Sequence, residues 1–206
     1  PSFEILTAQH GQANRHRGLM REVISQQLDE WAPKGSFDFE EFASYFPVTV
    51  MCRLIGANPD VIPSLRSAME AIGRSTSMDK RWLPAMQEGT VTMENFVNKL
   101  LAARRKEDRT GVEADLLDML LKTQSETDLT ERELVDILIF LFVAGYDTSK
   151  NMLTLTMWLL MDRPEIYQRC AQDPAYARKV VEETFRYHSI ISAQRTLLED
   201  VVYRDV

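Results

Sequence analysis

The chain has 206 residues, of which 45% are apolar and 27% charged, and its formal net charge is −7 at pH 7. This composition is typical of a soluble globular protein and excludes the collagen-like, low-complexity and disulfide-scaffold classes. The acidic balance argues against nucleic acid as a partner. The two cysteines, Cys52 and Cys170, favour a reducing compartment, so we expect a cytoplasmic location.

Apolar residues recur at helical spacing through the first part of the chain. The spacing predicts helices over residues 14–31, 37–55, 60–74, 83–106 and 115–123. We expect Pro47 to break the second of these into two pieces. The basic triplet Arg104, Arg105 and Lys106 is interpreted as a solvated helix end, where cations suit the helix dipole.

The segment from Thr130 to Met161 predicts one long helix. Thr130 and Glu133 have the spacing of a capping box, and 32 residues of helix extend about 48 Å. Residues 138–143 are apolar on every side, so we expect them to be buried all round. The apolar run 137–145 is too short to span a bilayer, and the N-terminal residues do not have the pattern of a signal peptide.

Two shorter helices are predicted after the long one, over residues 164–170 and 175–187, followed by two short strands within residues 195–206. We find no internal repeat and no linker of domain scale, so residues 1–206 are predicted to form a single, mainly α domain.

Polar residues interrupt the middle of the long apolar helix. Gly145 costs about 1 kcal/mol relative to alanine there, and Asp147 needs a partner if it is buried. The hydroxyl of Thr148 can bond back to a carbonyl in the preceding turn and bend the helix. Two interpretations stay open: a functional groove beside Gly145 with Thr148 facing it, or a kinked packing helix with one satisfied aspartate.

A second polar pair, Glu183 and Arg186, lies three residues apart on one helix face and can form an ion pair. Apolar neighbours at Val180, Val181 and Phe185 predict that this pair is partly or fully buried. The chain has three histidines and no CxxC or HExxH motif, so a metal site made by the protein alone is not expected.

The two motifs in this order resemble the cytochrome P450 superfamily of haem-thiolate monooxygenases. Ala-Gly-x-Asp-Thr-Ser at 144–149 is similar to the oxygen-binding groove of the family's central helix, and Glu183-x-x-Arg186 is similar to its Glu-x-x-Arg helix. Further similar stretches lie at residues 51–56, 115–120, 163–165 and 195–200. The resemblance implies the helical part of the cytochrome P450 fold, with a long central helix and a short β segment at the C-terminal end. Residues 1–206 would be the central portion of that catalytic domain.

The resemblance also implies the reaction and the site. The enzyme would be a monooxygenase that uses haem (iron protoporphyrin IX) to insert one oxygen atom from O₂ into a small or medium apolar organic substrate. Its partners would be a ferredoxin-like or flavin electron donor, with no nucleic acid and no membrane. The implied residues are Asp147 and Thr148 for catalysis, Arg17, Ala144, Gly145 and Arg195 for haem binding, Ile190, Ile191, Ser192 and Ala193 for substrate binding, and Glu183 and Arg186 for structure.

The sequence departs from the family in two places. Ala13 occupies the position where the family usually has histidine, and the family's cysteine-ligand motif does not occur in this chain, so no metal ligand is assigned to it. Cys52 and Cys170 are interpreted as packing residues. Two explanations stay open: a portion of a longer monooxygenase, or a short haemless module that works as a helical binding or scaffold protein. We favour the first because the Asp147–Thr148 motif is intact.

Overall fold

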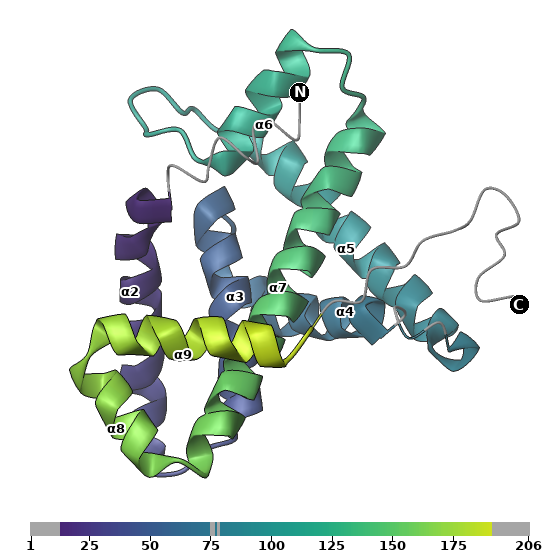
Figure 1. Ribbon diagram of the computed structural model, residues 1–206. Helices are drawn as coiled ribbons and strands as arrows, with labels where there is room; N and C mark the ends of the chain where they lie inside the picture. The colour runs from purple at the N-terminus through teal and green to yellow at the C-terminus, as the bar shows by residue number, and fades with distance from the viewer. Residues whose placement is uncertain (1–12, 75–76, 78, 191–206) are drawn as a thin grey trace, which may run out of the picture. The chain divides into compact units, whose positions relative to one another are not determined.

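The computed structural model describes residues 13–74, 77 and 79–190 (Figure 1). The chain divides into two compact units, Pro1–Thr154 and Leu155–Val206, and each unit is described by itself. The prediction of a single domain stays a prediction.

The described residues are mainly helical and contain no strand, which confirms the mainly α fold class. The helices of the first unit are α2 (Ala13–Trp31), α3 (Phe39–Ile55), α4 (Ile62–Arg74), α5 (Leu83–Arg104) and α6 (Leu116–Glu126). Helix α7 (Glu131–Met161) begins in the first unit and ends in the second, which also contains α8 (Pro164–Gln172) and α9 (Pro174–Tyr187). Short 3₁₀ helices among the described residues are η2 (Ala32–Lys34), which follows α2, η3 (Pro59–Val61), which precedes α4, and η5 (Lys80–Trp82), which precedes α5. The strands predicted within residues 195–206 lie outside the described residues.

The core of the first unit is made by α3, α4, α5, α6 and α7. Its fully buried side chains include Leu65, Met69, Met93, Leu138 and Phe142. Burying a side chain of this size contributes about 1.5–3 kcal/mol, so this shared core holds the five helices together.

Helices α4 and α5 cross at unusually short range because α5 has a glycine at the contact. A Cβ added at Gly89 would lie 2.8 Å from the backbone oxygen of Ala68. Any larger residue at this position would force the two helices apart.

The long helix α7 begins as predicted. The backbone N–H of Thr130 donates to Glu133 Oε2 at 2.8 Å, and the N–H of Glu133 donates to Thr130 Oγ1 at 3.3 Å, which confirms the capping box. The helix then continues unbroken to Met161, and no strand occurs within it. The prediction that residues 138–143 are buried all round was wrong, because Phe140 is 64% exposed. The described neighbours of α7 in this unit cover the side that carries Leu138 and Phe142.

Pro47 does not break α3, contrary to the prediction. Helix α3 runs unbroken through Pro47. Asp38 caps its start by accepting hydrogen bonds from two backbone N–H groups, and buried side chains on both sides of the proline, including Ala43 and Val48, pack into the unit. Proline removes only one backbone bond from the helix, and this packing offsets that loss.

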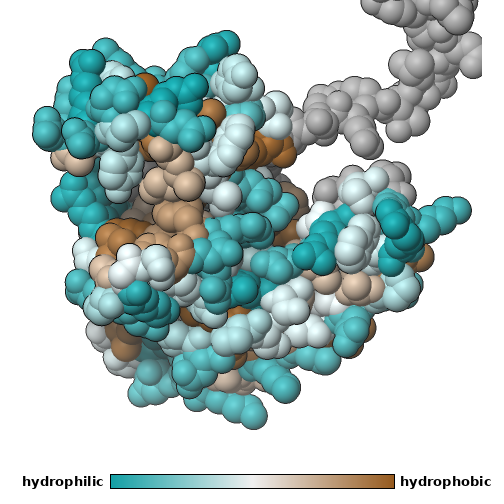
Figure 2. Space-filling model, turned by 90° about the horizontal axis from the view of Figure 1, so that it is seen from below, coloured by the Kyte–Doolittle hydropathy of each residue, from teal (hydrophilic) through white to brown (hydrophobic). Residues whose placement is uncertain are grey.

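The surface is predominantly hydrophilic, yet several large apolar side chains reach it. Figure 2 shows hydrophobic patches between hydrophilic side chains on the face drawn there. Among the described residues, no helix combines the length and apolar character that a membrane crossing requires.

Candidate functional site

The polar turn of α7 has the local geometry that its sequence predicts. The hydroxyl of Thr148 donates to the carbonyl oxygen of Ala144 at 2.7 Å, which confirms the predicted back-bond. Both residues are half-buried. With its one proton used in this bond, the Thr148 oxygen keeps lone pairs that can accept a hydrogen bond from a water or a ligand.

Asp147 lies beside this bond and next to α4. A Cβ added at Gly73, on α4, would lie 3.2 Å from Asp147 Oδ2 and 3.4 Å from Oδ1, so the carboxylate occupies the space that the glycine leaves. Asp147 is half-buried, and none of the described residues gives it a hydrogen bond or an ion pair. The carboxylate is therefore partly shielded from water and able to accept a hydrogen bond from a bound water or ligand.

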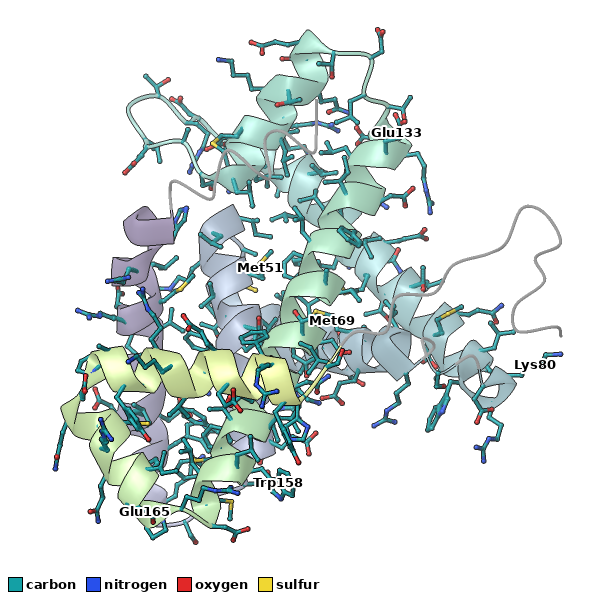
Figure 3. All side chains as sticks on the ribbon, in the orientation of Figure 1. Met51, Met69, Lys80, Glu133, Trp158 and Glu165 are labelled. Atoms are coloured by element: carbon teal, nitrogen blue, oxygen red, sulfur yellow. The ribbon has the colours of Figure 1, made fainter. Side chains whose placement is uncertain are left out.

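Gly145 faces α3 and not an empty groove. A Cβ added at Gly145 would lie 3.6 Å from the Sδ atom of Met51, which is ordinary contact distance. Figure 3 shows Met51 on α3, on the side that faces α7. On the side of Gly145 where a Cβ would point, the prediction of open space was wrong, because the flexible side chain of Met51 fills that space.

A charged cluster on another face of α7 was missed by the sequence reasoning. The hydroxyl of Tyr146, which is fully buried, donates to Glu70 Oε1 on α4 at 2.8 Å. The ammonium group of Lys150 lies 3.6 Å from the same oxygen and 3.2 Å from Glu40 Oε1 on α3. Burial, and then the hydrogen bond to Glu70, raise the pKa of Tyr146, so its hydroxyl stays protonated and donates. The spacing of Tyr146 and Lys150, one helical turn apart, was the available signal.

The solvated helix end predicted for Arg104, Arg105 and Lys106 is confirmed for Arg105 and Lys106, which are exposed, and was wrong for Arg104, which is buried. Arg104 is 4% exposed, and its Nη1 atom donates at 2.8 Å to both Asp115 Oδ1 and Asp118 Oδ1. Its Nη2 atom donates at 2.8 Å to the carbonyl oxygen of Ile55 at the end of α3. The Arg104 node, defined as Arg104, Arg109, Asp115 and Asp118, therefore joins three helices of the first unit.

The charges of the Arg104 node stabilise one another. Burial alone would raise the pKa of Asp118, but hydrogen bonds from Arg109, from the backbone of Asp115 and from Arg104 lower it to about 2. Asp115 and Asp118 also form a capping box at the start of α6. The node is structural, and it removes Arg104 from any surface that could bind a polyanion.

In the second unit, Glu183 and Arg186 form an ion pair that is exposed and not buried. Arg186 Nε donates to Glu183 Oε2 at 2.7 Å, and Arg186 Nη2 donates to Glu183 Oε1 at 2.6 Å. The side chain of Arg186 is 68% exposed and that of Glu183 is 60% exposed. The predicted burial was wrong because Val181 and Phe185 are themselves exposed in this unit.

Glu183 also contributes to the rim of a cavity of about 730 Å³ within the second unit. Trp158, Ile166, Val180 and Thr184 are among the residues that line this cavity. It contains neither Asp147 nor Thr148, which belong to the other unit.

The remaining predicted site residues are only partly described. Arg17 is exposed on α2, and Ile190 is half-buried after α9. Arg195, Ile191, Ser192 and Ala193 lie outside the described residues, so their predicted roles stay predictions.

Cys52 does not have the character of a metal-binding thiolate. Cys52 is fully buried in α3, and burial raises the pKa of its thiol to about 11. Cys170 is half-buried on α8, and both thiols are free. Among residues 13–74, 77 and 79–190, no group of three potential metal-binding side chains occurs.

Comparison with protein families gives a match to the model described as Cytochrome P450, over residues 74–206. Among curated proteins, the chain is 30% identical to mycinamicin IV hydroxylase/epoxidase of Micromonospora griseorubida over 209 residues, which covers 97% of this chain and 50% of that protein. It is 29% identical to 6-deoxyerythronolide B hydroxylase of Saccharopolyspora erythraea, with coverages of 83% and 41%. The chain thus spans about half the length of the curated relatives it matches.

Solved structures give the same fold. The putative thioether synthase SgvP superposes with a TM-score of 0.70 at 28% identity, covering 85% of this chain and 44% of that one. CalO2 superposes with a TM-score of 0.78 at 20% identity, covering 94% of this chain and 50% of that one.

Proposed function

The chain belongs to the cytochrome P450 family, and from this premise we propose that the whole protein is a haem-dependent monooxygenase. It inserts one oxygen atom from O₂ into a small or medium apolar organic substrate. The observation that carries the proposal lies in the middle of α7, where the Thr148 hydroxyl donates to Ala144 and the adjacent side chain, Asp147, has no hydrogen bond or ion pair from the described residues. Relatives that are named as hydroxylases support oxygen insertion as the reaction.

The residues of α7 fit the distal side of a haem. Ala144 and Gly145 have little or no side chain, so a flat ligand can approach the helix closely, and Met51 is flexible enough to move from such a ligand. Cys52 does not fit a haem ligand, because burial raises the pKa of its thiol to about 11, and Cys170 does not lie in the family's cysteine-ligand motif. When bound, haem supplies the activation of O₂.

We assign proton delivery to Asp147 and Thr148. Asp147 would relay protons from solvent, as the resemblance implies, taking one from a water on the solvent side and passing one to the water that Thr148 holds. Thr148 Oγ1 accepts a hydrogen bond from an ordered water while its own O–H donates to the carbonyl oxygen of Ala144. The two side chains thus hold a water, and the proton it carries, at one turn of the helix.

The remaining assignments rest on the resemblance. Arg17 and Arg195 would contact the haem propionates, and residues 190–193 would line the substrate pocket, where three of the four are apolar. Electrons would come from a ferredoxin-like or flavin protein. The two free cysteines support a cytoplasmic location.

The test replaces Thr148 by alanine in the haem-loaded full natural chain. Substrate affinity should stay nearly unchanged, because alanine removes only a methyl and a hydroxyl group from the pocket wall. Product formed per NAD(P)H consumed should fall at least several-fold, because proton delivery to the bound oxygen is impaired. Ser149→Ala is the matched control, since it deletes a hydroxyl from an exposed position one residue away.

Two results would overturn the proposal. Unchanged coupling and rate in Thr148→Ala would reduce Thr148 to a packing residue. Failure of the full natural chain to retain haem, measured by absorption after purification, would favour the haemless helical module.

A further inference from the structure

In helix α7, the residues at the turn that carries the proposed catalytic residues have low intrinsic helix stability. Gly145 lowers local helix stability, and the back-bond from Thr148 to Ala144 competes with the helical hydrogen bonds of that turn. A helix with these two features needs contacts from outside to hold one orientation.

Two polar side chains of this turn contact the same carboxylate of α4. Glu70 Oε1 accepts the hydrogen bond of Tyr146 at 2.8 Å and lies 3.6 Å from the ammonium group of Lys150. Tyr146 is fully buried, and the side chains of Lys150 and Glu70 are 12% and 28% exposed. Hydrogen bonds between a charged and a neutral group are among the stronger ones in proteins, and partial burial protects them from screening by salt.

Two cationic side chains lie close to the carboxylate of Glu70. Arg66 Nε lies 3.8 Å from Glu70 Oε1, and Lys150 also contacts Glu40 of α3. These groups surround a polar cavity of about 290 Å³, whose lining also includes Asp38, Glu41 and Ser44. Four carboxylates and two cationic side chains line the cavity, so the carboxylates attract both Arg66 and Lys150 electrostatically.

Tyr146 and Lys150 flank Asp147 and Thr148 in sequence and lie one turn apart on the same face of α7. Successive residues of an α-helix are rotated by about 100°. Fixing the side chains at 146 and 150 therefore fixes the directions in which Asp147 and Thr148 point.

We propose that Glu70, Tyr146 and Lys150 form a latch, the Glu70 latch, which sets the rotation of the Asp147–Thr148 turn. They are positioning residues for proton delivery, and in this respect the inference rests on the proposed function. The latch gives a tyrosine and a lysine of α7 a common partner, because both reach the same carboxylate of α4.

The test measures backbone hydrogen exchange by mass spectrometry in the full natural chain. Glu70→Ala and Tyr146→Phe should raise exchange of residues 146–150 about tenfold more than that of residues 134–141 in the same helix. A hydrogen bond to a charged group supports a change of this size. Glu70→Gln should restore most of the protection, because its amide oxygen still accepts the Tyr146 hydrogen bond.

Glu94→Ala is the matched control. Glu94 has the same 28% side-chain exposure as Glu70 and also contacts α7, through Arg132 at 2.8 Å, but near the start of the helix. Its removal should leave residues 146–150 unchanged. If Glu70→Ala does not fold, the exchange of Tyr146→Phe alone tests the proposal, since this substitution removes only the hydroxyl.

The inference is overturned if Glu70→Ala and Tyr146→Phe act no more strongly than Glu94→Ala. A uniform increase along α7, or no rescue by Glu70→Gln, would also overturn it. Exchange is measured without turnover, so its outcome is independent of the Thr148→Ala coupling experiment. A failed oxygenase with intact local exchange effects would disprove the proposed function and leave the latch.

Discussion

Two arginine–carboxylate clusters in this chain have similar chemistry and opposite environments. In the first unit, Arg104 is 3% exposed along its side chain and bonds to Asp115, Asp118 and a backbone carbonyl. In the second unit, Arg186 is 68% exposed and bonds to Glu183 alone. Short distances occur in both, so distance does not separate a cluster that organises the fold from one that lies on its surface.

The difference is in what each arginine joins. Arg104 connects the ends of α3 and α5 with the start of α6, and removing it leaves two partly buried carboxylates with one arginine partner, Arg109, instead of two. Arg186 bonds to a residue one turn away on its own helix, where water replaces a lost partner easily. Burial and the number of elements joined therefore determine the energetic contribution.

The largest expected effect is that of Arg104→Ala. It should lower the free energy of unfolding by about 3–5 kcal/mol, because the carbonyl oxygen of Ile55 loses its donor and the partly buried Asp115 and Asp118 keep only Arg109 as an arginine partner. The measurement is urea unfolding followed by circular dichroism. Arg105→Ala is the control: Arg105 is 43% exposed and pairs with Glu131 at 2.7 Å, so its loss should cost under about 1 kcal/mol. Equal losses in the two variants would contradict the comparison.

The next largest effect should come from Gly56→Ala. Gly56 ends α3 at a φ of 67°, and a Cβ there would collide with Arg104 Nη2 and lie 2.9 Å from Asp115 Oδ2. Backbone strain of about 1–3 kcal/mol adds to the displacement of Arg104. We expect a loss of about 3 kcal/mol in total.

Gly111→Ala separates the two causes of that loss. Gly111 has a φ of 76°, but nothing lies within 4 Å of the added Cβ. Only the strain of a left-handed residue remains, which is about 1–2 kcal/mol. If Gly56→Ala and Gly111→Ala lower the free energy of unfolding equally, displacing Arg104 has no measurable effect on stability.

A third, smaller effect concerns acid. The pKa of Asp118 is about 2 in the folded chain, below the value of about 3.9 in an unfolded chain. Its contribution of about 2 kcal/mol is therefore fully present above pH 4, and it is lost as the pH falls from about 4 to about 2. Glu131, whose pKa Arg105 and Gln124 lower to about 2, titrates in the same range.

Asp118→Asn tests this contribution. The variant should be less stable at pH 7, and its free energy of unfolding should fall less than that of the parent between pH 4 and pH 2. Asp136→Asn, at a side chain that is 51% exposed, is the control. Parallel pH curves for parent and Asp118→Asn would show that the carboxylate contributes nothing to folding.

The sequence predicted those features that depend on neighbouring residues. The capping box of Thr130, the continuous helix α7 and the bond from Thr148 to Ala144 each involve residues within four positions of one another, so spacing alone indicates them. The family resemblance depended on the same local pattern.

The features that the sequence did not predict depend on contacts between distant segments. Arg104 meets the carbonyl of Ile55 across 49 positions, and Tyr146 meets Glu70 across 76. Phe140 and Phe185 were expected inside because they are apolar, but burial depends on which surface faces them. No local pattern specifies such a partner.

The smallest expected effect is that of Arg186→Ala, and it tests the comparison from the other end. Its partner Glu183 is exposed, so losing the pair exposes no unsatisfied buried charge. Urea midpoints of this chain and of Arg186→Ala should agree within experimental error at low salt. At 1 M salt, where charges are screened beyond about 3 Å, any small difference should disappear. Glu183→Gln should behave in the same way, because either substitution removes the same exposed contact. A loss approaching that of Arg104→Ala, persisting in high salt, would mean that the pair is buried in solution, and exposure would then fail to separate the two clusters.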